Sequence, residues 1–361
     1  MSRATTATIH VDALRHNLAR VRQLAPESRV MAVVKADGYG HGLERVARAL
    51  EGADAFGVAA LSDAERLRAA GLSQRIVLLS GFDEVSDFAV LRRLGVDTVV
   101  HHESQLAMLA ADAAAGEAGE PIRVWLKIDT GMHRLGFPLE RAAEVHAQLR
   151  ALPNVAADIL RMTHFASSDE FAGAQTALQI ERFAQASDDF AGQASLSNSA
   201  AVLGWPQAHR DWVRAGGALY GLSVVAGKTG ADFGLMPAMT LSTRLIAINR
   251  VAKGERIGYS ATWECPEDMP VGVAAIGYGD GYPRHAPAGT PVLVNGVRTR
   301  VIGRVSMDLM TIDLRDVPAA VGDAVTLWGP ELPAEEVAAE AGTISYELTC
   351  SITRRVRFVE A

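Results

Sequence analysis

The sequence predicts an α/β protein with an N-terminal (β/α)8 barrel of the TIM type and a C-terminal all-β domain. Three observations support this fold class. Short apolar runs alternate with amphipathic segments through about residue 220, their connections are only a few residues long, and short β-type runs replace this pattern after Pro237. Regular alternation of strands and helices implies a parallel sheet, and the number of units suits a closed eightfold barrel. A doubly wound open sheet is the alternative.

The elements of the barrel can be placed along the chain by their periodicity. Predicted strands cover residues 30–34, 56–60, 76–79, 98–100, 122–128, 159–163, 194–197 and 212–215. Predicted helices cover residues 12–18, 43–50, 62–70, 85–94, 105–115, 138–152 and 175–190. Ser62 and Glu65 have the spacing of a capping box, which predicts the start of the third helix.

The alternation ends near residues 226–230, where glycines interrupt the chain. Beyond Pro237 the predicted strands are separated by Gly, Pro, Asp and Asn, as in an all-β domain. They cover residues 240–251, 271–276, 292–294, 301–305, 309–312 and 324–327. We therefore expect residues 1–230 to form the barrel and residues 231–361 to form the β-rich domain.

Composition narrows the class of protein. The 361 residues suffice for two domains with sizeable cores. A net charge of -7 without a long basic block argues against a nucleic-acid partner. Cys265 and Cys350 have neither a disulfide framework nor metal-ligand spacing, which favours a reducing compartment. Because no apolar run suits a membrane span or a secretory signal, we expect a cytoplasmic protein.

Residues 30–42 join a buried strand to a reactive amine. Five apolar residues lead into Lys35, which places it at the carboxyl end of the strand, where barrel sites lie. Apolar surroundings there would lower the pKa of the amine and make it a nucleophile or a base. Three glycines follow within residues 38–42, beside Tyr39 and His41, and allow the backbone to approach a ligand. The alternative is a barrel-rim lysine before a flexible turn.

Other polar residues follow the predicted strands and should meet Lys35 on the same face of the barrel. They are Arg134, His164, Asn198 and Arg214. The guanidinium of Arg134 suits bidentate binding of a carboxylate. Ser199 offers a hydroxyl, and Gly216 and Gly217 offer backbone N–H groups that suit a phosphate. Taken singly, these residues are equally compatible with surface, core and turn positions.

In this order, the motifs resemble those of alanine racemases over residues 12–356. The matching segments cover residues 30–42, 127–136, 162–169, 197–201, 214–221, 258–260, 275–284 and 303–308. The resemblance implies that Lys35 holds pyridoxal 5'-phosphate as an internal aldimine. It also implies interconversion of L-alanine and D-alanine by two-base proton transfer at Cα, without a metal, in a homodimer with shared active sites.

The resemblance assigns a role to each candidate residue. Lys35 serves the D-isomer, and Tyr259 of the partner subunit serves the L-isomer. Arg134 contacts the cofactor and the substrate carboxylate, which the Met307 N–H also binds from the partner. The remaining cofactor-binding residues are Tyr39, His164, Asn198, Ser199, Arg214, Gly216 and Gly217. Arg214 would face the pyridine nitrogen and, because arginine keeps its proton, leave that nitrogen unprotonated.

The chain departs from the family at two positions and leaves a third open. Ser195 stands where many members have histidine, and Arg354 replaces a tyrosine that contacts phosphate in some members. Lys127 occupies a position that is carbamylated in some members, which would turn a cation beside Arg134 into an anion.

Other functions are compatible with parts of the pattern. A racemase of broader amino-acid specificity is one, because the residues around the site entrance set the tolerated side chain. Arg214 opposes a decarboxylase of similar build, which favours an acid at the ring nitrogen. Tyr259 and Met307 oppose a non-catalytic pyridoxal-phosphate carrier, which needs no second base.

Overall fold

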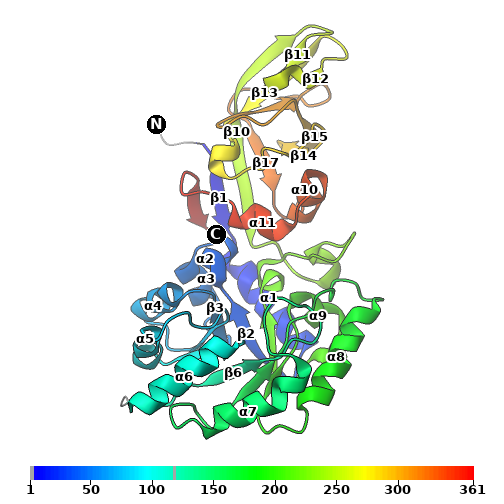
Figure 1. Cartoon of the computed structure of the whole chain (residues 1–361). Helices are drawn as coiled ribbons and strands as arrows, with labels where there is room; N and C mark the ends of the chain where they lie inside the picture. The colour runs from blue at the N-terminus through cyan, green and yellow to red at the C-terminus, as the bar shows by residue number, and fades with distance from the viewer. Residues whose placement is uncertain (1–3, 117–118) are drawn as a thin grey trace. The chain divides into compact units, whose positions relative to one another are not determined.

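The computed structural model describes residues 4–116 and 119–361, which form two compact units. The barrel unit comprises Leu18–Gly38 and Gly42–Leu219. The β unit comprises the N-terminal residues through Asn17, Tyr39–His41 and Tyr220–Ala361. Both units are drawn in Figure 1.

The barrel unit is built on an eight-stranded parallel sheet in the order β8-β7-β6-β5-β4-β3-β2-β9. Its strands are β2 (Arg29–Val33), β3 (Ala55–Val58), β4 (Arg75–Leu78), β5 (Val96–Val100), β6 (Val124–Lys127), β7 (Leu160–Met162), β8 (Ala194–Ser195) and β9 (Trp212–Ala215). The Arg214 N–H donates to the Ser197 carbonyl across 3.0 Å, which joins the two outer edges of the sheet. This arrangement confirms the predicted barrel and excludes the open sheet.

Helices cover the outside of the sheet (Figure 1). They are α3 (Leu43–Ala49), α4 (Leu61–Ala69), α5 (Asp87–Leu94), α6 (Glu103–Ala115), α7 (Ala142–Ala151), α8 (Ala174–Ser187) and α9 (Ser199–Gly204), and α1 (Val11–Leu24) runs through both units. The predicted capping box is wrong, because α4 begins at Leu61 and Ser62 lies inside its first turn. Among the described residues, no helix is long and apolar enough to cross a membrane.

Large side chains fill the barrel interior toward the amino ends of the strands. Trp125 and Trp212 meet edge to face with ring centroids 5.7 Å apart, within a buried cluster that includes Met31. The indole N–H of Trp125 donates to Asp97 at 2.9 Å, and Arg75 forms an ion pair with the same carboxylate. Because these side chains fill the interior at the amino ends, a site in this barrel is expected at the carboxyl ends of the strands.

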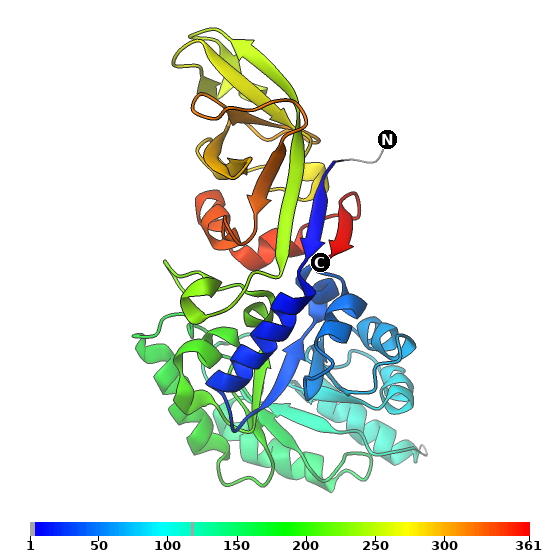
Figure 2. The same ribbon diagram turned by 180° about the vertical axis from the view of Figure 1, so that it is seen from behind.

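The β unit contains a sheet in the order β13-β16-β15-β14-β17-β10-β1-β18. Its strands are β1 (Thr6–Ile9), β10 (Met239–Val251), β13 (Met269–Ala274), β14 (Pro291–Val294), β15 (Val297–Ile302), β16 (Met310–Asp313), β17 (Ala324–Trp328) and β18 (Arg357–Glu360). β1, which the sequence did not predict, lies between β10 and β18 (Figure 2). Segments near both chain ends therefore build the same sheet.

The C-terminal domain predicted to be all β is mostly β, because it also contains α10 (Ala334–Ala341) and α11 (Ser345–Cys350). The alanines and glutamates of α10 have high helix propensity, and Gly342 ends the helix with a φ of 70°. The signal for this helix was therefore present in the sequence.

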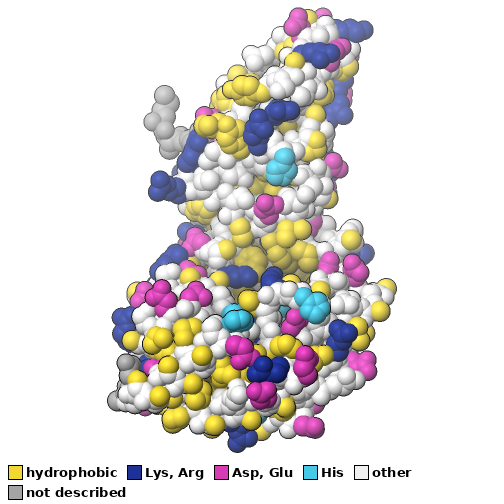
Figure 3. Space-filling model, viewed as in Figure 1, with side chains coloured by type: hydrophobic (Ala, Val, Ile, Leu, Met, Phe, Trp, Pro, Cys, Tyr) yellow, Lys and Arg dark blue, Asp and Glu magenta, His cyan; other side chains and the backbone are white. Residues whose placement is uncertain are grey.

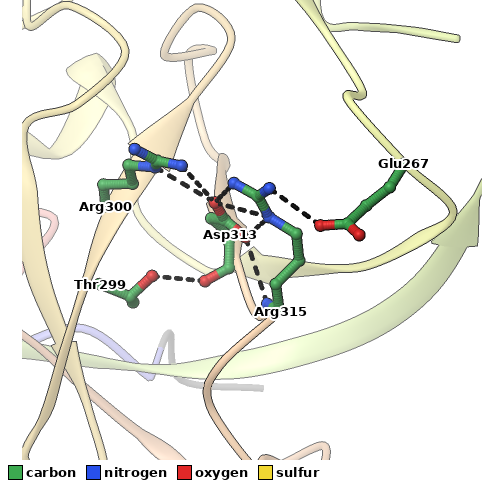
Figure 4. Close-up of polar contacts among 5 residues, drawn as sticks. All are labelled: Glu267, Thr299, Arg300, Asp313 and Arg315. Carbon is green, nitrogen blue, oxygen red and sulfur yellow. Dashed lines mark hydrogen bonds and ion pairs between the residues drawn. The ribbon is translucent and has the colours of Figure 1, made fainter. Parts of the chain in front are cut away.

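A buried carboxylate ties together neighbouring segments of the β unit (Figure 4). Asp313, at the end of β16, accepts hydrogen bonds from Arg300 at 3.1 Å and Arg315 at 2.7 Å. Arg315 continues to Glu267 at 3.1 Å, in the segment that follows the hairpin strand β12 (Trp263–Glu264). Burial would raise the pKa of Asp313, but the hydrogen bonds from Arg315 and Arg300 outweigh it and lower the pKa.

Candidate active site

A left-handed turn follows Lys35, which lies two residues past β2. Residues 36–39 all have φ between 51° and 63°, and three of them are not glycine. The left-handed conformation costs about 1–2 kcal/mol for such a residue. Asp37 supports the turn, since its Oδ1 accepts from the Leu43 N–H at 3.1 Å and from Arg66 at 2.9 Å. Stored strain beside a reactive side chain is typical of functional sites.

The side chain of Lys35 is exposed, so the predicted apolar surroundings are wrong. The apolar residues of β2 are buried, but Lys35 stands on the rim beyond them. Its charge acts on Lys127 and on His164, together with the charges of Arg134 and Arg214. Lys35 therefore belongs to a group of four cations at the carboxyl ends of the strands.

Lys127, the last residue of β6, belongs to this positive group and is 7% exposed. Burial lowers the pKa of its amine to about 8, with contributions from the charges of Arg214 and Arg134. Asp129 acts in the opposite direction. A lysine with this pKa is partly neutral near physiological pH. The positive charges around it would stabilise a negatively charged group at this site.

The loop that carries Arg134 is shaped by Asp129. Its Oδ1 accepts the backbone N–H groups of Gly131, Met132 and His133 at 3.0–3.1 Å. Burial would raise the pKa of Asp129, but the hydrogen bonds from Gly131 and His133 outweigh it and lower the pKa. The carboxylate thus stays charged and folds the loop, which leaves Arg134 exposed at its end.

Arg214 is a buried cation whose hydrogen-bonding partners are neutral. From β9 it donates to the carbonyl and hydroxyl oxygens of Ser195 at 2.9 and 2.7 Å. It also donates to the carbonyls of Thr163 at 2.7 Å and Leu196 at 3.1 Å. Burial lowers its pKa to about 10, which still leaves it charged at neutral pH. Ser195, one of the two departures from the family, holds this guanidinium directly.

His164 stays neutral beside Arg214. Its Nδ1 lies 3.3 Å from the guanidinium, which can only donate, so the ring hydrogen belongs on Nε2. Burial holds the pKa of His164 well below its ordinary value, and the charges of Arg214 and Lys127 add to the effect. A neutral ring can pack against a ligand without adding to the positive charge.

Ser199 and Asn198 organise the neighbouring strand ends. Asn198 caps α9 by accepting from the Ala201 N–H at 3.0 Å. The Ser199 hydroxyl accepts the N–H groups of Gly216 at 2.8 Å and Ala218 at 3.2 Å. The N–H of Gly216, expected to face a phosphate, therefore points at Ser199, and the hydroxyl hydrogen of Ser199 is the donor left for a ligand. Gly217 is buried next to them.

Tyr39 belongs to the β unit, in an aromatic cluster. Its ring stacks on Tyr220 at 4.7 Å and meets Tyr346 edge to face at 5.5 Å. Burial raises the pKa of Tyr39, and the Cys350 thiol adds to this effect, so the phenol remains a hydrogen donor. The adjacent Gly40 has a φ of 79°, and a Cβ there would lie 2.0 Å from the Thr349 carbonyl, so only glycine fits.

Tyr259 lies on a strained and exposed turn of the β unit. The turn connects β11 (Arg256–Ile257) and β12, and Gly258, Ser260 and Ala261 on it all have positive φ. The phenol side chain is 66% exposed and Met307 is 52% exposed. Hydrophobic side chains are scattered among polar and charged ones on the face of this unit drawn in Figure 3. The side chains of Tyr259 and Met307 are therefore both accessible on the surface of this unit.

Sequence reasoning missed some residues of this site. His101 directly follows β5, and it lies near enough to Lys127 for that charge to add to the effect of burial, which lowers the pKa of His101. The strand-end rule could have found it. Thr130, Thr163 and Gln179 are also missing from the prediction, and they form a buried network described below.

Comparison with known proteins agrees with these findings. The family models for the N-terminal and C-terminal domains of alanine racemase match residues 9–224 and 238–360. The alanine racemase of Shewanella loihica is 53% identical over 351 residues, which cover 97% of each chain. The biosynthetic alanine racemase of Pseudomonas aeruginosa has a TM-score of 0.96 at 45% identity, over 99% of both chains. A structure from Bartonella henselae, described with covalently bound pyridoxal phosphate, has a TM-score of 0.90 at 24% identity, over 99% of both chains. The chain therefore belongs to the alanine racemase family.

Proposed function

We propose that this chain binds pyridoxal 5'-phosphate on Lys35 and interconverts L-alanine and D-alanine, with Lys35 and Tyr259 as the two bases. One observation carries the proposal: Lys35 and three cations from other segments, Lys127, Arg134 and Arg214, lie near His164. Such a group suits a cofactor with a phosphate and a substrate with a carboxylate. In this proposal residues 1–230 bind the cofactor and residues 231–361 contribute to the site of a partner subunit.

The residues of the barrel unit fit the cofactor in their chemistry. Lys35 supplies the amine for covalent attachment, and Arg134 and Arg214 supply fixed positive charge. The Ser199 hydroxyl has a hydrogen free to donate after accepting from Gly216 and Ala218. Asn198 and Gly217 are the other barrel residues proposed to bind the cofactor, and Tyr39 of the β unit is proposed to bind it as well. When bound, pyridoxal phosphate draws electrons away from Cα of the substrate and makes its proton removable.

Racemisation needs one proton to leave one face of Cα and another to reach the opposite face. Lys35 takes or returns the proton of the D-isomer, and Tyr259 does the same for the L-isomer. Arg134 orients the substrate by binding its carboxylate, with the Met307 N–H of a partner. Arg214 keeps its proton, so it holds charge beside the site without exchanging hydrogen.

The exposure of Tyr259 supports the proposal of a second subunit. A phenol that exchanges protons with Cα needs a site from which bulk water is excluded, yet this side chain is 66% exposed in the single chain. We propose a homodimer in which each chain supplies Lys35 to one site and Tyr259 to the other.

The direct test follows the optical rotation of L-alanine with purified protein and pyridoxal phosphate. The rotation should decay to zero while D-alanine accumulates. A non-catalytic carrier would change neither signal. Parallel runs with L-serine and L-lysine separate a dedicated alanine racemase from one of broad specificity, because only the latter turns over all three at similar rates.

We also propose that Lys127 is carbamylated. Its neutral amine would add to CO2 and lose a proton, which replaces a cation with an anion near Arg134 and Arg214. Because the pKa of Lys127 is about 8, the neutral fraction and hence the carbamate should increase as the pH rises through 8. A carbon-13 NMR signal from labelled bicarbonate should appear at pH 8.5 in wild type and be missing in Lys127→Ala. Identical spectra for the two proteins would refute the modification.

A further inference from the structure

We propose that Gln179 is a positioning residue for this reaction. It lies on α8, on the outside of the barrel, and holds the loop that carries Arg134 against the strand end that carries His164. This inference rests on the proposed function, since it concerns the spacing of two groups of the proposed site.

The side chain of Gln179 is completely buried and fully hydrogen bonded. Its Nε2 donates to the Thr130 hydroxyl and to the His164 carbonyl, each at 3.0 Å. Its Oε1 accepts from the Ala166 N–H at 2.9 Å. Only one orientation of the amide satisfies all three partners, because the oxygen must face the N–H and the nitrogen must face the two acceptors. A single side chain thus fixes the segments after β6 and after β7.

The network continues from Gln179 toward Arg214. The hydroxyls of Thr130 and Thr163 lie 2.8 Å apart, and each residue is 1% exposed. The Thr163 carbonyl accepts from Arg214 at 2.7 Å. Hydrogen bonds of buried residues therefore connect α8, the segments that follow β6 and β7, and β9. Breaking one of them leaves a polar group without water to replace its partner, so the network resists small shifts of the strand ends.

Two other side chains of α8 contact the same loop, and they differ from Gln179 in the number of segments that they connect. Gln175 donates to the Gly131 carbonyl and Arg182 to the Thr130 carbonyl, each at 3.2 Å. Both contact the backbone of one loop only, whereas Gln179 bridges two segments. Gln175, which is partly exposed, therefore serves as a matched control on the same helix.

The test replaces Gln179 with methionine, which has similar length and volume but forms none of the three hydrogen bonds. If Gln179 positions the site, the KM for alanine should rise about tenfold while kcat changes less than about threefold, since Arg134 acts in substrate binding. Amide hydrogen exchange in residues 129–136 should accelerate about tenfold even without cofactor, while exchange in α6 stays unchanged. Gln175→Met should change KM by less than about twofold.

Two results would overturn the proposal. One is a Gln179→Met protein whose KM and loop exchange match wild type, even if its melting temperature is lower. The other applies if Gln179→Met does not fold. Thr130→Val then removes the hydrogen bond between Gln179 and Thr130, and an unchanged KM in that variant would contradict the positioning role of Gln179. If the proposed function itself is wrong, the wild-type protein will not racemise alanine at all. This result differs from a failure of the Gln179 proposal, in which the wild-type protein is active.

Discussion

Lys35→Ala should lose racemase activity by at least about 10³-fold, because this amine is proposed both to attach the cofactor and to exchange a proton with the D-isomer. The visible absorbance of the lysine-bound cofactor should disappear from the purified variant at the same time. Lys35 lies on the barrel rim beyond β2, and its side chain is exposed, so removing it should leave the fold intact. Unchanged circular dichroism would establish that the loss is chemical rather than structural.

Two matched variants sharpen this expectation. Lys35→Arg keeps the positive charge but holds its proton too tightly to attach the cofactor, so it should be as inactive as the alanine variant. Lys228→Ala removes an exposed lysine that pairs with Asp232 and should behave as wild type. Borohydride reduction followed by peptide mass mapping gives a direct readout. Cofactor found on a lysine other than Lys35 would contradict the assignment.

The sequence predicted those parts of the molecule that depend on local pattern. Strand and helix periodicity is local, so the barrel and its strands could be predicted, and the strand-end rule selected Arg134, His164 and Arg214. The rule failed for the surroundings of Lys35. The apolar pattern of a buried strand does not predict whether the residue after it is also buried. Here Lys35 follows a buried strand but is exposed.

Features that depend on distant parts of the chain escaped prediction. β1 has four residues and forms only because β10 and β18, more than 200 residues away, pair with it. Gln179 sits inside an amphipathic helix where a polar residue carries no signal of its own. Its importance arises from three partners on two other segments, which only a folded barrel brings together.

Tyr259→Phe should lower racemisation by about 10²- to 10⁴-fold, the range expected when a general acid–base group is removed. Phenylalanine preserves the ring and removes only the hydroxyl. The exposed turn that carries Tyr259 should tolerate this change without loss of stability. In deuterated water the variant should still exchange the Cα hydrogen of D-alanine through Lys35, without producing L-alanine. Exchange of L-alanine at the wild-type rate would show that another group acts on that face.

Subunit mixing tests whether the two bases come from different chains. When Lys35→Ala and Tyr259→Phe chains are coexpressed with different tags, each mixed dimer should contain one site with both intact residues. Random pairing makes about half of the dimers mixed, so the preparation should recover about a quarter of wild-type activity, and the isolated mixed dimer about half. Each variant alone should remain nearly inactive. If Lys35 and Tyr259 of the same chain worked together, both sites of every mixed dimer would lack one base and no activity would return. A cofactor-binding dimer without recovery would therefore reject the shared site while leaving the two bases themselves in place.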